Sequence, residues 1–190
     1  SLLDEFSQFI NLINPENKIY LSKNNNNILR IKKIKNLTNS LFLILYRKPD
    51  YQARSLHIQH ENFCNLQKKD KFVLEYMNTI GHYEFGENHK VFFNSNTHND
   101  NLGDVNYWLY QWIKVYRYLL DLRKKDKDSN NVSFLSYEKL TQNTASLNRS
   151  LSNFLKMEIF IDKIDNKNDQ NKIKNILFNK DLLDEANIIY

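Results

Sequence analysis

The spacing of hydrophobic residues alternates between helix-like and strand-like patterns in the first quarter of the chain. Apolar residues recur three and four positions apart over residues 2–13, which predicts an amphipathic helix. A short strand is expected at Lys18–Ser22, followed by a second helical stripe over residues 28–37. The apolar run "LFLILY", residues 41–46, predicts a strand covered on both faces, as at the centre of a parallel sheet.

Two helices separated by an irregular region are expected next. The first runs from about Pro49 to beyond Phe63, because proline is tolerated at a first helical position, whose N–H has no intrahelical partner. The second is a long helix capped by Asp104 or Asn106. Between them we expect a helical piece, a loop or hairpin, and mobile residues at 94–101.

The last third of the chain repeats the alternation. Residues 132–137, "VSFLSY", predict a third strand, and Leu147–Leu155 mark the helix after it. Residues 162–175 form a solvated connector or a polar helix, and residues 180–190 close the chain as a helix. The alternation of strands and helices predicts one α/β domain over residues 1–190. We expect a three-layer, P-loop-like fold with a central, mostly parallel sheet flanked by helices.

Composition narrows the class of protein. The chain has 190 residues, of which 41% are hydrophobic, and a net charge of +5, which favours anionic partners such as nucleotides, nucleic acid or acidic glycans. The single cysteine, Cys64, excludes an internal disulfide and a cysteine-based zinc site, so a reducing cytoplasm fits best. No apolar run approaches the roughly 18 residues that cross a bilayer.

The ends of the predicted strands carry the candidate chemistry. Lys23, Arg47 and Tyr137 each follow a strand, and ligands of open α/β sheets bind at the carboxyl ends of the strands. Arg47 can grip phosphate oxygens with two N–H groups, next to a helix N-terminus, and Ser55 can reach back with its hydroxyl. The alternative is that Arg47 and Lys48 are solvated loop cations and Ser55 a surface hydroxyl, and the local sequence leaves both open.

Four stretches, taken in order, resemble the bacterial branch of the sulfotransferases that use 3'-phosphoadenosine 5'-phosphosulfate (PAPS). Arg47 and Ser55 in "YRKPDYQARS" match the family's 3'-phosphate motif, and Lys23 is similar to its lysine one βα unit earlier. "FLSYEKL", residues 134–140, resembles the tyrosine and glutamate motif near the adenine, and residues 180–190 resemble the family's closing helix. The resemblance covers most of the chain from Lys18 onward.

The resemblance implies an enzyme that moves a sulfuryl group from PAPS to a hydroxyl or amine of a small-molecule or glycan acceptor. Arg47 and Ser55 would bind the 3'-phosphate, and Tyr137 would lie near the adenine. Lys23 would contact the transferring group and stabilise the charge that develops there. PAPS and its product 3',5'-bisphosphoadenosine would be the only cofactors, with no metal.

Two features of the family are absent from this chain. The glycine-rich phosphosulfate loop has no counterpart, because Gly81, Gly86 and Gly103 do not fall between a predicted strand and helix, so we expect the chain to lack an N-terminal strand, loop and helix. Cytosolic members have a histidine base two residues after the lysine. Asn25 stands there and cannot take a proton at neutral pH.

Residues 64–104 are the expected acceptor-side insertion, and within them His82 and Glu84 are the candidate bases. The missing glycine loop and Asn25 motivate an alternative, a non-catalytic module that binds nucleotides or polyanions on the same fold.

Other residue patterns favour ordinary structural roles. His57 and His60, one turn apart with Glu61, offer two imidazoles and a carboxylate for a metal, but packed histidines are the favoured interpretation without a further ligand. Trp108 and Trp112 share a helix face, which is typical of a core. The basic runs "RIKKIK" and "RKKDKD" lie on amphipathic helices without interleaved aromatic residues, which argues against nucleic acid as a partner.

Overall fold

The structure is a computed structural model that describes residues 2–14, 16, 18–36, 38–93, 101–125, 131–142, 144–162 and 177–190. The chain divides into two compact units, Ser1–Phe42 and Leu43–Tyr190, and each is described by itself. The expected mobile residues 94–100 and most of the expected connector, residues 163–175, lie outside the described residues.

The first unit is helical. Helix α1 spans Leu2–Ile13, as its apolar spacing predicts, and a 3-10 helix, η1 (Asn25–Arg30), leads directly into α2 (Ile31–Lys35). The predicted stripe over residues 28–37 is thus divided between a 3-10 turn and a short α-helix. The asparagine run explains this division, because the Asn24 side chain accepts the Asn26 N–H at 2.8 Å and competes with regular helical pairing.

The expected strand at Lys18–Ser22 is wrong. Residues 18–24 belong to no helix or strand, and the side chains of Ile19 and Leu21 are 74% and 91% exposed. A strand exists only where its N–H and C=O groups pair with a neighbouring strand, and apolar alternation over five residues does not supply that neighbour.

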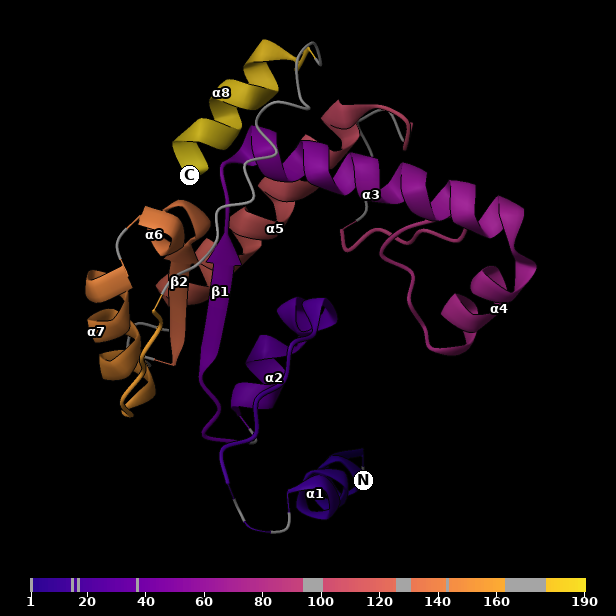
Figure 1. Cartoon of the computed structure of the whole chain (residues 1–190). Coiled ribbons are helices and arrows are strands. Elements are labelled where there is room, and N and C mark those ends of the chain that lie inside the picture. The colour runs from indigo at the N-terminus through magenta and orange to yellow at the C-terminus, as the bar shows by residue number, and fades with distance from the viewer. Residues whose placement is uncertain are drawn as a thin grey trace. The chain divides into compact units, whose positions relative to one another are not determined.

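The second unit contains a sheet of two parallel strands, β1 (Phe42–Tyr46) and β2 (Val132–Ser136), which lie side by side in Figure 1. Both strands were predicted, and the helices together with this small parallel sheet are compatible with the predicted α/β class. The three-layer arrangement around a central sheet is not seen in the described part of the chain. On β1, Leu43 and Leu45 are 38% and 55% exposed, whereas the sequence predicted burial on both faces.

The helices of the second unit follow most of the predicted boundaries. They are α3 (Pro49–Lys69), α4 (Lys71–Thr79), α5 (Val105–Lys125), α6 (Tyr137–Gln142), α7 (Thr144–Leu155) and α8 (Lys180–Ile189). Proline occupies the start of α3, as expected. None of the described helices is long and apolar enough to span a bilayer.

Helix α5 forms the main core of the second unit. Its side chains Leu109, Ile113 and Leu119 are fully buried, and both α3 and α8 pack against it. A smaller core of Leu140, Leu147 and Leu151 joins α6 to α7, both of which lie beside β2 in Figure 1.

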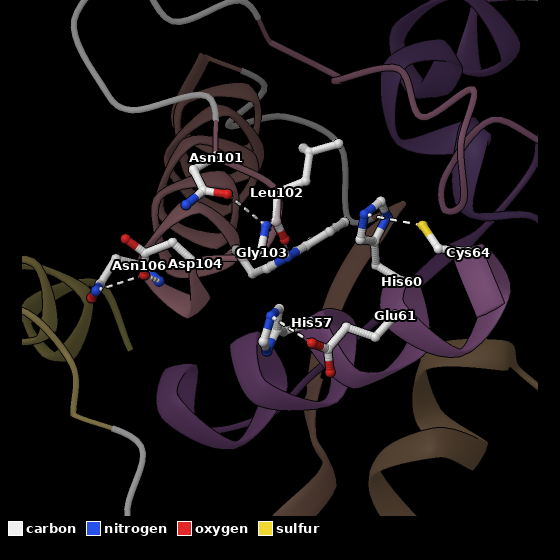
Figure 2. Close-up of polar contacts among 10 residues, drawn as sticks. His57, His60, Glu61, Cys64, Asn101, Leu102, Gly103, Asp104 and Asn106 are labelled. Carbon is white, nitrogen blue, oxygen red and sulfur yellow. Dashed lines mark hydrogen bonds and ion pairs between the residues drawn. The ribbon is translucent and has the colours of Figure 1, made fainter.

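The start of α5 is fixed by side-chain hydrogen bonds to the backbone (Figure 2). Asp104 accepts the N–H of Asn106 at 2.8 Å, which agrees with the predicted cap. Just before it, the side chain of Asn101 accepts the N–H of Gly103 at 3.1 Å. The turn thereby sets the direction in which α5 enters the core.

Candidate functional site

Arg47 lies where β1 ends, between two tyrosine rings. Its guanidinium carbon is 5.3 Å from the centroid of the Tyr51 ring, in the first turn of α3, and 5.0 Å from that of Tyr137, directly after β2. The side chain is half-buried and makes no ion pair with any described residue. Two aromatic faces therefore hold a cation that keeps its five N–H donors available.

Parallel pairing of β1 and β2 brings these residues together. Arg47 and Tyr137 are 90 positions apart in the sequence, yet each comes directly after one of two adjacent parallel strands. The carboxyl ends of such strands meet at one edge of the sheet. The sequence predicted this juxtaposition, whereas the functional roles of the two residues stay predictions.

Glu138 connects the same two strand ends. Its Oε1 accepts the backbone N–H of Lys48 at 3.0 Å, and its Oε2 accepts the hydroxyls of Ser136 at 2.8 Å and Tyr190 at 3.2 Å. Burial by itself would raise the pKa of Glu138, but these hydrogen bonds outweigh it and hold the pKa below its ordinary value. The carboxylate thus fixes the backbone next to Arg47.

A polar network beneath the strand ends fixes α3 to α5. The Tyr116 hydroxyl donates to the carbonyl oxygen of Leu45 at 3.1 Å and lies 3.3 Å from Gln52 Oε1, which also accepts the Trp112 indole N–H at 3.0 Å. Burial raises the pKa of Tyr116 to about 12. Since Gln52 lies in the first turns of α3, the helix that follows Arg47 is held against the core.

The side chain of Ser55 lies on the exposed side of α3. It follows Tyr51 by four residues, and residues four apart share a helix face. Ser55 therefore extends the face on which Tyr51 contacts Arg47, one turn further from the helix start. It makes no hydrogen bond with another described residue.

The edge of the sheet combines three features that suit a phosphate carried by an aromatic nucleotide. Arg47 supplies a fork of donors, and the first turn of α3 has N–H groups with no intrahelical acceptor. The rings of Tyr51 and Tyr137 offer flat apolar faces. This combination can bind a phosphate that is attached to an aromatic base.

Lys23 and Asn25 belong to the first unit, whose residues are described separately from those of the second. Lys23 is exposed in the irregular segment 18–24 and follows no strand. Asn25 begins η1, directly after the capping residue Asn24. The proposed roles of both residues depend on the resemblance alone.

His82 and Glu84, the candidate bases, are paired with each other. His82 Nδ1 lies 3.4 Å from Glu84 Oε2 in the segment that follows α4. The carboxylate is mostly buried, whereas a third of the His82 side chain is exposed. A carboxylate beside an imidazole is an arrangement that can accept a proton and stabilise the imidazolium that forms.

A second cluster, built around His60, has no counterpart among the predicted sites. His60 is 6% exposed, and its Nε2 lies 3.5 Å from the Sγ of Cys64, one turn further along α3 (Figure 2). The rings of His60 and His89 are 5.7 Å apart, and each lies against the Trp108 ring. The spacing of His60 and Cys64 was visible in the sequence, but nothing there pointed to His89.

The cluster is not built as a thiol nucleophile with its base. The N–H of Gly86 donates to His60 Nδ1 at 3.2 Å, so a neutral His60 carries its proton on Nε2 and offers the thiol a donor instead of an acceptor. Burial, followed by the charge of Glu87, raises the pKa of Cys64. Both effects oppose formation of a thiolate.

His57 does not join His60 in a metal site. Its Nε2 lies 3.7 Å from Glu61 Oε1, whereas His60 contacts Cys64, so Figure 2 shows two separate pairs on α3. Among the described residues, no group of three or more histidine, cysteine, aspartate or glutamate side chains is placed to hold a metal ion.

No protein-family model, curated protein or solved structure matches this chain. The assignment of a function therefore depends on the residues and their geometry.

Proposed function

We propose that the chain is part of a PAPS-dependent sulfotransferase and binds the nucleotide at the carboxyl ends of β1 and β2. One observation carries the proposal: the Arg47 guanidinium is held between the rings of Tyr51 and Tyr137, without a carboxylate partner among the described residues. A structural arginine in a half-buried position is ordinarily paired with an acid.

The geometry suits the 3'-phosphate end of the nucleotide. A guanidinium matches phosphate oxygens with two parallel N–H donors, and the rings beside it exclude water from one side. The Tyr137 ring offers an aromatic neighbour for the adenine, and Ser55 offers a hydroxyl on the Tyr51 face of α3. Glu138 supports the site from below, because it fixes the Lys48 N–H.

The reaction would be an in-line displacement at sulfur. The acceptor oxygen forms a bond to sulfur, the bond from sulfur to the 5'-phosphate oxygen breaks, and 3',5'-bisphosphoadenosine leaves. By the resemblance alone, Lys23 would neutralise charge on the leaving oxygen. The pair of His82 and Glu84 is the candidate base, and His82 lies against Phe63, about four turns along α3 from the helix start. Positioning and cationic stabilisation would dominate, as in phosphoryl transfer.

A non-catalytic module for nucleotides or polyanions is the alternative. It is favoured by Asn25, which stands where a base would be. Transfer of labelled sulfate from PAPS to any acceptor would reject this alternative. Binding of 3',5'-bisphosphoadenosine without transfer would support it.

Calorimetric titration with 3',5'-bisphosphoadenosine tests the binding site. Arg47→Ala should weaken binding roughly tenfold or more, because a hydrogen bond to a charged group contributes about 1.5–3 kcal/mol. Lys48→Ala is the matched control: it removes the same charge from the next residue, whose side chain is exposed, and leaves its backbone N–H in place.

The two variants separate a specific site from general charge attraction. The proposal expects Lys48→Ala to change the affinity less than threefold, in line with a solvent-exposed charge. Equal losses in both variants, or no binding by the unaltered protein at millimolar ligand, would contradict it.

A further inference from the structure

The His60 imidazole accepts a hydrogen bond from the segment Gly81–Lys90, and the donor is a backbone amide that cannot become an acceptor. The backbone N–H of Gly86 points at His60 Nδ1 at 3.2 Å, and an amide N–H can only donate. Nδ1 must therefore be unprotonated for this contact to exist. The proton of the neutral ring is on Nε2, which faces Cys64.

His89, which lies within the segment itself, also has the hydrogen-bond pattern of a neutral ring. Its Nδ1 is 2.7 Å from the backbone carbonyl oxygen of Glu84, which only accepts, so Nδ1 carries the proton. Its Nε2 accepts the hydroxyl of Tyr107 from α5 at 2.8 Å. Both imidazoles therefore bond through one donor and one acceptor nitrogen, the pattern of the uncharged ring.

The two rings are too close to carry two charges without a cost. Their centroids are 5.7 Å apart, and Trp108 lies against both, at 5.2 Å from His60 and 5.1 Å from His89. Burial, then the charges of His89 and His57, lowers the pKa of His60, and burial lowers the pKa of His89. The indole of Trp108 is itself buried and offers no charge to compensate.

Charged and titratable groups surround the pair on all three elements. Those on α3 and in the segment are His57, Glu61, Cys64, His82, Glu84 and Glu87, and α5 contributes the hydroxyl of Tyr107. Glu87 and Glu61 raise the pKa of His60, and Glu84 raises that of His89. Burial is the larger effect for both histidines, so the net direction stays downward.

We infer that His60 and His89 form an acid-sensitive latch that holds the segment Gly81–Lys90 against α3 and α5 and releases it when both rings take up protons. A proton on His60 Nδ1 faces the Gly86 N–H and removes that contact. A proton on His89 Nε2 reverses the bond with the Tyr107 hydroxyl, which must then accept, and adds repulsion between the two rings. The contact of the Glu87 N–H with Gln67 Oε1 involves no titrating group and opposes release, so protonation shifts an equilibrium instead of unfolding the segment at once.

The direction with pH follows from the lowered pKa values. When the segment is released, the pKa of each histidine is near its ordinary value of 6.5, whereas when the segment is docked both pKa values are lower. The docked state therefore has its full stability above pH 6.5 and loses stability as the pH falls below it, through the lower docked values. Between pH 6.5 and the lower docked pKa values, each proton taken up on release changes the ratio of released to docked protein by about tenfold per pH unit.

Amide hydrogen exchange of the whole chain between pH 8 and pH 5 tests the latch. The amides of Gly86 and Glu87 report release directly, because side chains of α3 accept both N–H groups. After correction for the intrinsic pH dependence of exchange, their protection should be constant above pH 6.5. Below that value it should fall by more than tenfold per pH unit, which corresponds to more than one proton.

Two variants keep the hydrogen-bond acceptors and remove the titration. His60→Asn places a carbonyl oxygen near the position of Nδ1, and His89→Gln places one near that of Nε2. Each single variant should lose protection by at most tenfold per pH unit, because one proton remains. The double variant should show the same protection at pH 7.5 and pH 5.

Amides of α7 serve as the internal control for general acid unfolding, because α7 packs with α6 and not with the latch. Their protection should not change over the same pH range. Constant protection of Gly86 and Glu87 in the unaltered protein would overturn the inference. If His60→Asn does not fold, His89→Gln alone tests the latch, because it leaves the His60 contact with Gly86 intact. An unchanged pH dependence of protection in that variant would also overturn the inference.

Discussion

Glu138 is the residue through which three distant parts of the chain meet. Its carboxylate accepts donors from Lys48, Ser136 and Tyr190, and these bonds hold the pKa below the ordinary value of 4.5 although burial opposes them. A carboxyl whose pKa is lower in the folded protein stabilises the fold above its unfolded pKa. That stability is lost as the pH falls from 4.5 through the lower folded value.

Replacement of Glu138 should therefore have a pH-dependent effect on stability. Glu138→Gln keeps an oxygen that can accept the Lys48 N–H but loses the charge, which should cost on the order of 1 kcal/mol at pH 7. Urea denaturation at several pH values should show the difference from the unaltered protein narrowing between pH 4.5 and pH 3. A difference that is constant from pH 7 to pH 3 would contradict this account of the carboxylate.

Tyr116 should be a second sensitive residue below the site. Tyr116→Phe removes the hydroxyl that donates to the Leu45 carbonyl, and the part-buried acceptor then loses this donor. We expect a loss of about 1–2 kcal/mol in the free energy of unfolding. Tyr76→Phe, on an exposed ring of α4, is the control and should change stability by less than about 0.5 kcal/mol. Equal effects of the two variants would contradict the network.

At the scale of elements, the contact between α3 and the segment after α4 requires glycine. Gly86 has a φ of +91°, and a Cβ there would lie 2.4 Å from Gln67 Oε1. The Gln67 side chain is buried and bonded to Met77 Sδ and the Glu87 N–H, so it cannot move away without loss of both bonds. The close approach of this segment to α3 therefore depends on glycine, which has no Cβ, at position 86.

Gly81→Ala provides the matched comparison for Gly86→Ala. Both residues have positive φ, but nothing lies within 4 Å of a Cβ at Gly81. Both variants should lose about 1 kcal/mol to backbone strain, and Gly86→Ala should lose a further 1–3 kcal/mol to the close contact with Gln67. Chemical denaturation measures both. Equal losses would show that Gln67 adjusts freely.

The helices with sustained apolar spacing could be predicted from the sequence, and the isolated short strand could not. The spacing of α5 and α8 specifies one buried face whatever their neighbours are, and Pro49 marks the start of α3. Residues 18–22 alternate in the same way as a strand but have no pairing partner among the described residues. The local pattern of apolar residues is enough to predict a helix, whereas a strand also needs a distant segment to pair with.

For the whole molecule, long-range contacts were predictable only where a fold rule supplied them. Parallel strands place their carboxyl ends together, and this rule predicted that Arg47 and Tyr137 would be neighbours. No such rule connects His60 to His89, because one lies on a helix and the other in an irregular segment whose path depends on Gly86. The sequence therefore indicated the edge of the sheet and missed the histidine cluster.

The central claim is that Arg47, between Tyr51 and Tyr137, binds the 3'-phosphate of an adenine nucleotide. A crystal structure of the protein with 3',5'-bisphosphoadenosine tests it most directly. The account predicts two guanidinium nitrogens at about 2.8 Å from oxygens of the 3'-phosphate and the adenine beside Tyr137. A nucleotide bound away from Arg47, or none bound in crystals soaked at millimolar concentration, would contradict it.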